Sequence, residues 1–258
     1  MNVLVSNDDG IFAPGLWTLV RELKTIARVI VVAPDREQSA IGTAVTLRQP
    51  LRVQRVAPLI PDVETYTVEG TPSDSVILAL GKLVTSQVDM VITGINQGSN
   101  LGDDALISGT VSAALQGYLR GFPALAISVT RGNNLYLEDA ARLAALLAKR
   151  ICSDTSLMNV LLNVNLPNLP LVKIKGVKIT RLANKNYIDI VEEGHDGIQE
   201  YYWLVRQGTR GDTDRNTDLW AIENDNISIT PLHTIFSDKR SLPNVDSLYS
   251  GLLGELRG

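Results

Sequence analysis

Cysteine, histidine and aromatic residues are all scarce in this 258-residue sequence. Cysteine occurs once, histidine twice, and aromatic residues make up 5% of the chain. A single cysteine excludes an internal disulfide, and two histidines far apart in the sequence exclude a zinc cluster of Cys and His ligands. Hydrophobic residues reach 45% and are mostly aliphatic, a composition that excludes a disordered chain, a collagen-like chain and a coiled coil.

Long apolar runs and an excess of basic residues are also missing. No uninterrupted apolar stretch approaches the roughly 20 residues of a membrane-spanning helix. Asp8 and Asp9 interrupt the apolar start, so a signal peptide is not expected. The chain has 24 basic and 28 acidic residues, which argues against a broad nucleic-acid-binding surface but not against one nucleotide in a local pocket. We expect a cytoplasmic protein with neither a membrane nor a nucleic acid as its partner.

Short aliphatic runs alternate with helical patterns through the first two thirds of the chain. The runs predict strands at residues 3–5, 29–32, 65–68, 88–92, 124–129 and 160–164. Helical periodicity covers residues 16–23, 108–120 and 136–151, and a further helix is expected to begin with Thr71 as N-cap and Pro72 in its first turn. Continuous apolar strands separated by helices predict a Rossmann-like α/β fold, with a mostly parallel sheet covered on both faces.

The pattern changes after about residue 167. Strands are predicted at residues 177–182, 201–205 and 227–230 with no helix between them, a loop at residues 208–216, and a short helix only at residues 245–256. Without crossover helices, the strands of residues 183–230 are expected to pair as hairpins. We therefore predict a catalytic core at residues 1–183 and, at residues 184–258, a β-rich arm and C-terminal helix that complete the core and the subunit interface.

The predicted arm also suggests an assembly. Residues 201–205, Tyr-Tyr-Trp-Leu-Val, are the most aromatic cluster in the chain. An isolated two-stranded arm is marginally stable in water, and a partner subunit is the simplest cover for its edges and rings. We expect at least a dimer.

Three polar loops directly follow predicted strands, at residues 6–10, 33–39 and 94–100. In a parallel sheet all three lie at the carboxyl edge, where open α/β sheets bind their ligands. The first loop carries Asp8 and Asp9, and two adjacent carboxylates repel each other unless a cation or hydrogen-bond donors offset them. A shell of Asp, Asn and Ser oxygens suits Mg²⁺ or Mn²⁺. The alternative for this loop is a solvated Asp-Gly turn.

A helix is predicted to open at Ser108, Gly109 and Thr110, shortly after the third loop. Backbone N–H groups and hydroxyls at a helix N-terminus can hold a phosphate, although Ser108 alone could be an ordinary N-cap. A cation and a phosphate cradle together suggest phosphoryl chemistry.

The sequence lacks the phosphate loop G-x-x-x-x-G-K-[ST], the dinucleotide fingerprint G-x-G-x-x-G after the first strand, and the hydrolase elbow G-x-S-x-G. It also lacks the Asp-x-Asp of haloacid-dehalogenase-type phosphatases and the acceptor Asp of a receiver domain.

Five segments together resemble the SurE (survival protein E) family of acid phosphatases and nucleotidases. They are V-L-V-S-N-D-D-G-I-F-A-P-G at residues 3–15, A-P-D-R-E-Q-S at 33–39 followed by G-T-A-V-T from residue 42, E-G-T-P-S-D-S-V at 69–76, G-I-N-Q-G-S-N-L-G-D-D-A-L-I-S-G-T-V at 94–111, and S-I-T-P-L at 228–232. Together they span almost the whole chain, in the family's order.

The resemblance implies one divalent metal ion per subunit, Mg²⁺ or Mn²⁺, bound by Asp8, Asp9, Ser39 and Asn96. It also implies that the phosphate lies against Asn100, Ser108, Gly109 and Thr110. The catalytic residues would be Asp8 and Asp9, with Asp9 favoured as the group that takes the proton of water.

The implied reaction is hydrolysis of nucleoside 5′-monophosphates, and also of 3′-monophosphates, to nucleoside and phosphate. The implied assembly is a homodimer or homotetramer with C-terminal strands exchanged between subunits. Two alternatives stay open: a polyphosphatase or general phosphatase without nucleoside preference, and a nucleotide-binding sensor without turnover.

Overall fold

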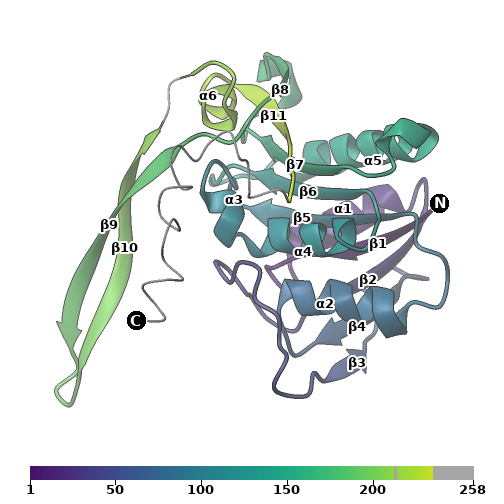
Figure 1. Cartoon of the computed structure of the whole chain (residues 1–258), viewed down its shortest axis with the longest axis horizontal. Coiled ribbons are helices and arrows are strands. Elements are labelled where there is room, and N and C mark those ends of the chain that lie inside the picture. The colour runs from purple at the N-terminus through teal and green to yellow at the C-terminus, as the bar shows by residue number, and fades with distance from the viewer. Residues whose placement is uncertain (212–213, 235–258) are drawn as a thin grey trace, which may run out of the picture.

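The apolar strands gather into one nine-stranded sheet in a computed structural model that describes residues 1–211 and 214–234. Six strands form its parallel centre: β1 Asn2–Ser6, β2 Arg28–Pro34, β4 Glu64–Val68, β5 Met90–Gln97, β6 Ala124–Val129 and β7 Leu161–Leu166. The order across the sheet is β3-β4-β2-β1-β5-β6-β7-β11-β8, where β11 is Asn226–Pro231 and β8 is Gly176–Ile179. Strand β3 Val53–Arg55 is antiparallel to β4. All six strands predicted in this part of the chain are confirmed, and so is the mostly parallel α/β fold (Figure 1).

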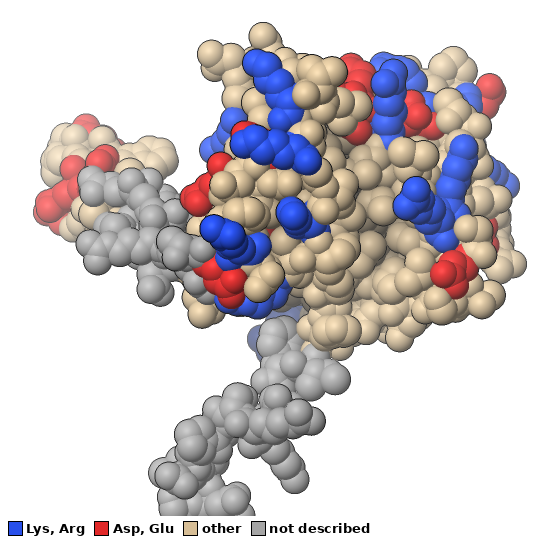
Figure 2. Space-filling view, turned by 90° about the horizontal axis from the view of Figure 1, so that it is seen from above, with Lys and Arg blue, Asp and Glu red and all other residues tan. Residues whose placement is uncertain are grey.

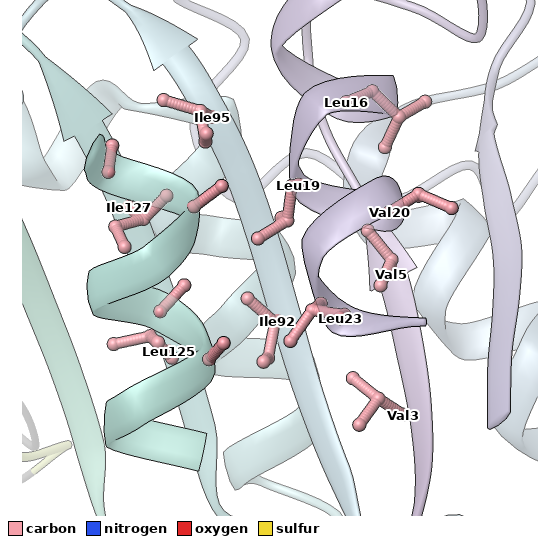
Figure 3. Packing of buried hydrophobic residues seen from close by; sticks show 14 of the residues in the cluster. Val3, Val5, Leu16, Leu19, Val20, Leu23, Ile92, Ile95, Leu125 and Ile127 are labelled. Carbon is pink, nitrogen blue, oxygen red and sulfur yellow. The ribbon is translucent and has the colours of Figure 1, made fainter. Parts of the chain in front are cut away.

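Helices cover both faces of this sheet (Figure 1). Helices α1 Pro14–Leu23 and α5 Leu137–Ser153 pack together on one face, while α2 Pro72–Leu78 and α4 Gly109–Tyr118 pack together on the other. The predicted periodicity is visible in Figure 3, where Leu19 and Leu23 of α1 point toward β5. Together with Leu16 they belong to one buried cluster that includes side chains of β1, β5 and β6. Burial of each such side chain contributes about 1.5–3 kcal/mol.

The helix starts follow the cap residues in the sequence. Thr71 caps α2 in a reciprocal capping box with Asp74, and Ser108 caps α4 by accepting a hydrogen bond from the N–H of Val111 at 3.2 Å. Short helical segments fill the connections: the π-helix η1 Ala79–Leu83, the helix α3 Asp104–Ile107, and the 3₁₀ turns η2 Thr155–Leu157 and η3 Leu171–Lys173.

The C-terminal part departs from the predictions in three ways. A helix, α6 Asp218–Glu223, lies where none was expected, because six residues are too few to show a helical period. Strand β10 Glu200–Gly211 continues into the predicted loop. Strand β11 Asn226–Pro231 joins the main sheet instead of a hairpin, antiparallel to β7 and parallel to β8 Gly176–Ile179.

The predicted hairpin arm is present (Figure 1). Among the described residues, strand β10 pairs only with β9 Lys185–His195, in a separate antiparallel sheet that projects from the core. The helix predicted at residues 245–256 lies outside the described residues.

No helix within the described residues is long and apolar enough to cross a membrane. On the face shown in Figure 2, basic and acidic side chains are interspersed and neither sign forms a broad patch.

Candidate active site

The sheet reverses its winding between β1 and β5. From β1 the chain builds outward through β2 and β4, and it then returns to the other side of β1 to add β5, β6 and β7. Such a switch point leaves a crevice at the carboxyl ends of the two strands. A cavity of about 840 Å³ lies there, lined by residues of the loops that follow β1, β2 and β5. The three polar loops therefore do converge.

Asp8 is a buried carboxylate with fixed partners. The hydroxyl of Thr110 donates a hydrogen bond to its Oδ1 atom, and its carbonyl oxygen accepts one from the N–H of Gln38 at 2.7 Å. A Cβ added at Gly109 would lie 2.8 Å from the Cβ of Asp8, so a glycine is needed for this close approach of α4. Burial raises the pKa of Asp8, and the hydrogen bond from Thr110 acts against that rise.

Asp9 is the second carboxylate of the acidic pair. Burial and the neighbouring charge of Asp8 raise the pKa of Asp9 to about 6. Its Oδ2 atom is buried and has no hydrogen-bond partner among the described residues. Two carboxylates with raised pKa values and an unpartnered oxygen are the arrangement that a bound cation would stabilise.

Two neutral oxygen donors line the same cavity. Ser39 donates its hydroxyl hydrogen to Glu37 at 2.6 Å, and Asn96 donates through Nδ2 to the carbonyl of Gly98 at 2.6 Å. Both interactions leave oxygen lone pairs available to a metal. The described residues contain no group of three or more Cys, His, Asp or Glu suited to a metal. The donor set is thus two carboxylates, a hydroxyl and an amide oxygen, which fits a hard cation such as Mg²⁺ or Mn²⁺.

The four predicted phosphate ligands divide into two pairs. Asn100 and Ser108 line the cavity. Gly109 and Thr110 are not among its lining residues, and Thr110 is fully buried behind Asp8. The phosphate role of all four stays a prediction, and the structure adds a contact between Thr110 and Asp8 that the sequence pattern did not suggest.

Sequence reasoning missed the residues that hold Asn100. Asn165 of β7 accepts a hydrogen bond from the N–H of Asn100 at 2.8 Å, and Asn163 donates to its carbonyl at 2.8 Å. The side chain of Asn100 donates to the hydroxyl of Ser128 at 2.9 Å. Asn163 and Asn165 are fully buried, and two asparagines on one face of an otherwise apolar strand were the available signal.

The cavity wall also carries charges that the sequence did not single out. Glu37 and Asp104 add two carboxylates to the acidic pair, while Arg131 is the only basic residue among the described residues that line the cavity. The Nε of Arg131 donates to the carbonyl of Gln97 at 3.3 Å, which places the guanidinium next to the segment that carries Asn96. Neither His195 nor His233 lines this cavity.

Several known proteins are similar to this chain. The sequence model of a protein family described as survival protein SurE matches residues 3–189 of this chain. A protein named 5′-nucleotidase SurE from Dehalococcoides mccartyi (strain CBDB1) is 53% identical over 259 residues, covering 100% of this chain and 98% of its own. Another of that name, from Legionella pneumophila (strain Paris), is 44% identical over 90% of this chain and 91% of its own. The crystal structure of the SurE protein from Aquifex aeolicus matches with a TM-score of 0.81 and 34% identity, covering 96% of this chain and 99% of its own. The chain belongs to the survival protein SurE family.

Proposed function

We propose that the protein is a metal-dependent phosphomonoesterase, a 5′-nucleotidase that hydrolyses nucleoside 5′-monophosphates and also 3′-monophosphates. The observation that carries this proposal is the convergence of Asp8, Asp9, Ser39 and Asn96 on one cavity at the switch point of the sheet. The relatives from Dehalococcoides and Legionella are named 5′-nucleotidases, which supports the 5′-nucleotidase part of this proposal.

The donor set would hold one Mg²⁺ or Mn²⁺ ion per subunit. When bound, such an ion polarises a phosphoryl oxygen and lowers the pKa of water. Asp8 is oriented for this task by the hydroxyl of Thr110 and the close packing of Gly109. We assign to the carboxylate of Asp9, whose Oδ2 has no partner among the described residues, the proton that water loses when it attacks phosphorus. The phosphorus–oxygen bond to the nucleoside breaks in the same reaction, and the departing oxygen takes a proton from solvent to become the nucleoside hydroxyl.

The rest of the cavity suits the substrate. Asn100 and Ser108 offer an amide and a hydroxyl to the phosphoryl oxygens, and Arg131 offers the positive charge that offsets a phosphate dianion beside four carboxylates. The apolar side chains of Ile107 and Leu135 also line the cavity, and they provide a surface for the nucleoside.

We further propose that residues 1–183 form the catalytic core and that residues 184–258 complete it and form a subunit interface, in a homodimer or homotetramer. The hairpin β9–β10 exposes large hydrophobic side chains: Tyr202 is 58% exposed, Trp203 65% and Leu204 84%. A second copy of the chain would remove these side chains from water.

One assay separates this proposal from its alternatives. Purified protein is incubated with Mg²⁺, Mn²⁺ or a chelator, and phosphate release is measured from 5′- and 3′-nucleoside monophosphates, short polyphosphate and p-nitrophenyl phosphate. The proposal requires metal-dependent release with the nucleotides as the best substrates. Equal rates on all monoesters would favour a general phosphatase, preferred release from polyphosphate a polyphosphatase, and nucleotide binding without release a sensor.

A further inference from the structure

Asp218, the first residue of α6, is a fully buried carboxylate that does not line the cavity. Its Oδ2 accepts a hydrogen bond from the N–H of Gly102 at 2.8 Å. Its Oδ1 accepts two more, from the N–H of Ala183 at 2.9 Å and from that of Leu219 at 2.8 Å. Buried charges are retained only where they are well hydrogen bonded, and these three main-chain N–H groups meet that requirement for Asp218.

The partners of Asp218 belong to two distant parts of the chain. Gly102 lies in the loop between β5 and α3, which also carries Asn100. Ala183 lies just before β9, and Asp218 itself follows β10, so the two ends of the hairpin arm meet at this carboxylate. The main chain strengthens the junction, because Arg181 donates to Asn216 at 2.9 Å and accepts from Asp218 at 3.0 Å. One side chain therefore joins the root of the arm to the loop of the candidate site.

We propose that Asp218 is a positioning residue that couples the root of the hairpin arm to the loop of residues 98–104. This inference rests on the proposed nucleotidase function. The loop is held on one side by Asn163 and Asn165 of β7, which bind the main chain of Asn100. Asp218 holds it on the other side at Gly102. With both sides held, Asn100 keeps its place at the cavity wall. When the bond to Gly102 is lost, Asn100 becomes mobile and substrate binding weakens.

A carboxylate is required because both of its oxygens accept hydrogen bonds. An amide has one acceptor oxygen. In Asp218→Asn that oxygen satisfies more donors when it faces the N–H groups of Ala183 and Leu219, so the NH₂ group faces Gly102 and the bond to the loop is lost. The matched control is Thr217→Ala. It removes the N-cap of α6, where the hydroxyl accepts from Trp220 at 3.3 Å, and leaves the side chain of Asp218 intact.

The first test compares the kinetics of wild type, Asp218→Asn and Thr217→Ala on a nucleoside 5′-monophosphate with Mn²⁺. For Asp218→Asn we expect KM and the inhibition constant of inorganic phosphate to rise about tenfold, as for loss of a charge-assisted hydrogen bond. Affinity for Mn²⁺ should change little, because Asp8 and Asp9 lie on another loop. Thr217→Ala should lose a similar amount of thermal stability and keep the wild-type KM. An unchanged KM in Asp218→Asn, or an equal rise in Thr217→Ala, would overturn the proposal.

The second test does not depend on activity, and its first measurement needs no variant. Hydrogen exchange of the wild-type protein, followed by mass spectrometry, should show slow exchange in the peptide that contains Gly102 although it lies in a loop. In Asp218→Asn the same peptide should exchange faster, and in Thr217→Ala it should not. Rapid exchange of this peptide in the wild type would refute the coupling. Failure of the proposed function alone would instead appear as absence of phosphate release with this protection intact.

Discussion

The parallel core and the C-terminal part contribute in different ways to the candidate site. The core supplies every proposed metal ligand, from the loops that follow β1 and β2 and from Asn96 at the end of β5, which leads into a third loop. The C-terminal part supplies none of them, yet Asp218 of α6 hydrogen bonds to one of those loops and β11 extends the sheet beyond β7. The chemistry thus depends on short segments next to buried strands. The position of the loop of residues 98–104 depends in addition on Asp218, more than a hundred positions later in the sequence.

The largest effect is expected in the core, at the acidic pair. Asp9→Asn is close to isosteric and should lower kcat by about 10²–10⁴-fold, because it removes a ligand charge and the proposed proton acceptor. Steady-state phosphate release at saturating Mn²⁺ measures this. The matched control is Asp62→Asn, at an exposed position outside the cavity, which should keep the wild-type rate. Wild-type turnover in Asp9→Asn would remove the acidic pair from the mechanism.

A smaller effect is expected at the cavity wall. Arg131→Gln should raise KM for nucleotides and the inhibition constant of phosphate by about tenfold, because it removes the charge that offsets the phosphate. Its affinity for Mn²⁺ should stay the same or tighten, since a cation near Asp9 is lost. Arg142→Gln on the outer side of α5 serves as control. Weaker Mn²⁺ binding in Arg131→Gln would show instead that Arg131 supports the metal ligands.

In the C-terminal part, the expected effect of a mutation is on assembly. Tyr202→Glu together with Leu204→Glu should dissociate the protein at micromolar concentration, because charges would be buried against a partner. Light scattering should give a multiple of 28.0 kDa for the wild type and a lower mass for the variant. Val172→Glu, at a 93% exposed position outside the arm, should assemble normally. A wild-type mass near 28 kDa would contradict the proposed interface.

The smallest effect concerns stability without metal. The pKa of Asp9 rises from 3.8 in the unfolded chain to about 6 in the folded protein. The ionised carboxylate therefore destabilises the fold increasingly as the pH rises from 3.8 through about 6. In chelator, Asp9→Asn should therefore raise the melting temperature at pH 7.5 by about 2–4 °C, for about 1 kcal/mol of relieved repulsion and burial. At pH 5 the gain should be smaller. Scanning calorimetry of both proteins at the two pH values measures this gain. A gain at pH 5 that equals or exceeds the gain at pH 7.5 would contradict the prediction.

The two regions also differ in how far the sequence predicts them. The six parallel strands of the core and its helices α1, α2, α4 and α5 were predictable, because burial imposes continuous apolar runs or a helical period. Strand β9, in contrast, lies in a hairpin outside the main sheet, and its sequence K-N-Y-I-D-I-V-E-E-G-H shows neither a continuous apolar run nor a helical period. Helix α6 was missed for another reason, since its six residues are too few to show a helical period.

For the site, the sequence identified the residues but not all of their partners. Asp8, Asp9, Ser39 and Asn96 were found from their place after predicted strands and from the family resemblance, and they do line one cavity. The hydrogen bonds of Asn163, Asn165 and Asp218 to the loop could not be predicted, because they depend on tertiary contacts between residues 63 to 116 positions apart.

Titration of the metal-free protein with Mn²⁺ tests the central claim most directly. Calorimetry should show one ion bound per chain in the wild type. Binding should be abolished or strongly weakened in Asp9→Asn and retained in Asp218→Asn, since the ligands belong to the core and Asp218 only positions a loop. Equal Mn²⁺ binding by wild type and Asp9→Asn, in number and affinity, would contradict the account.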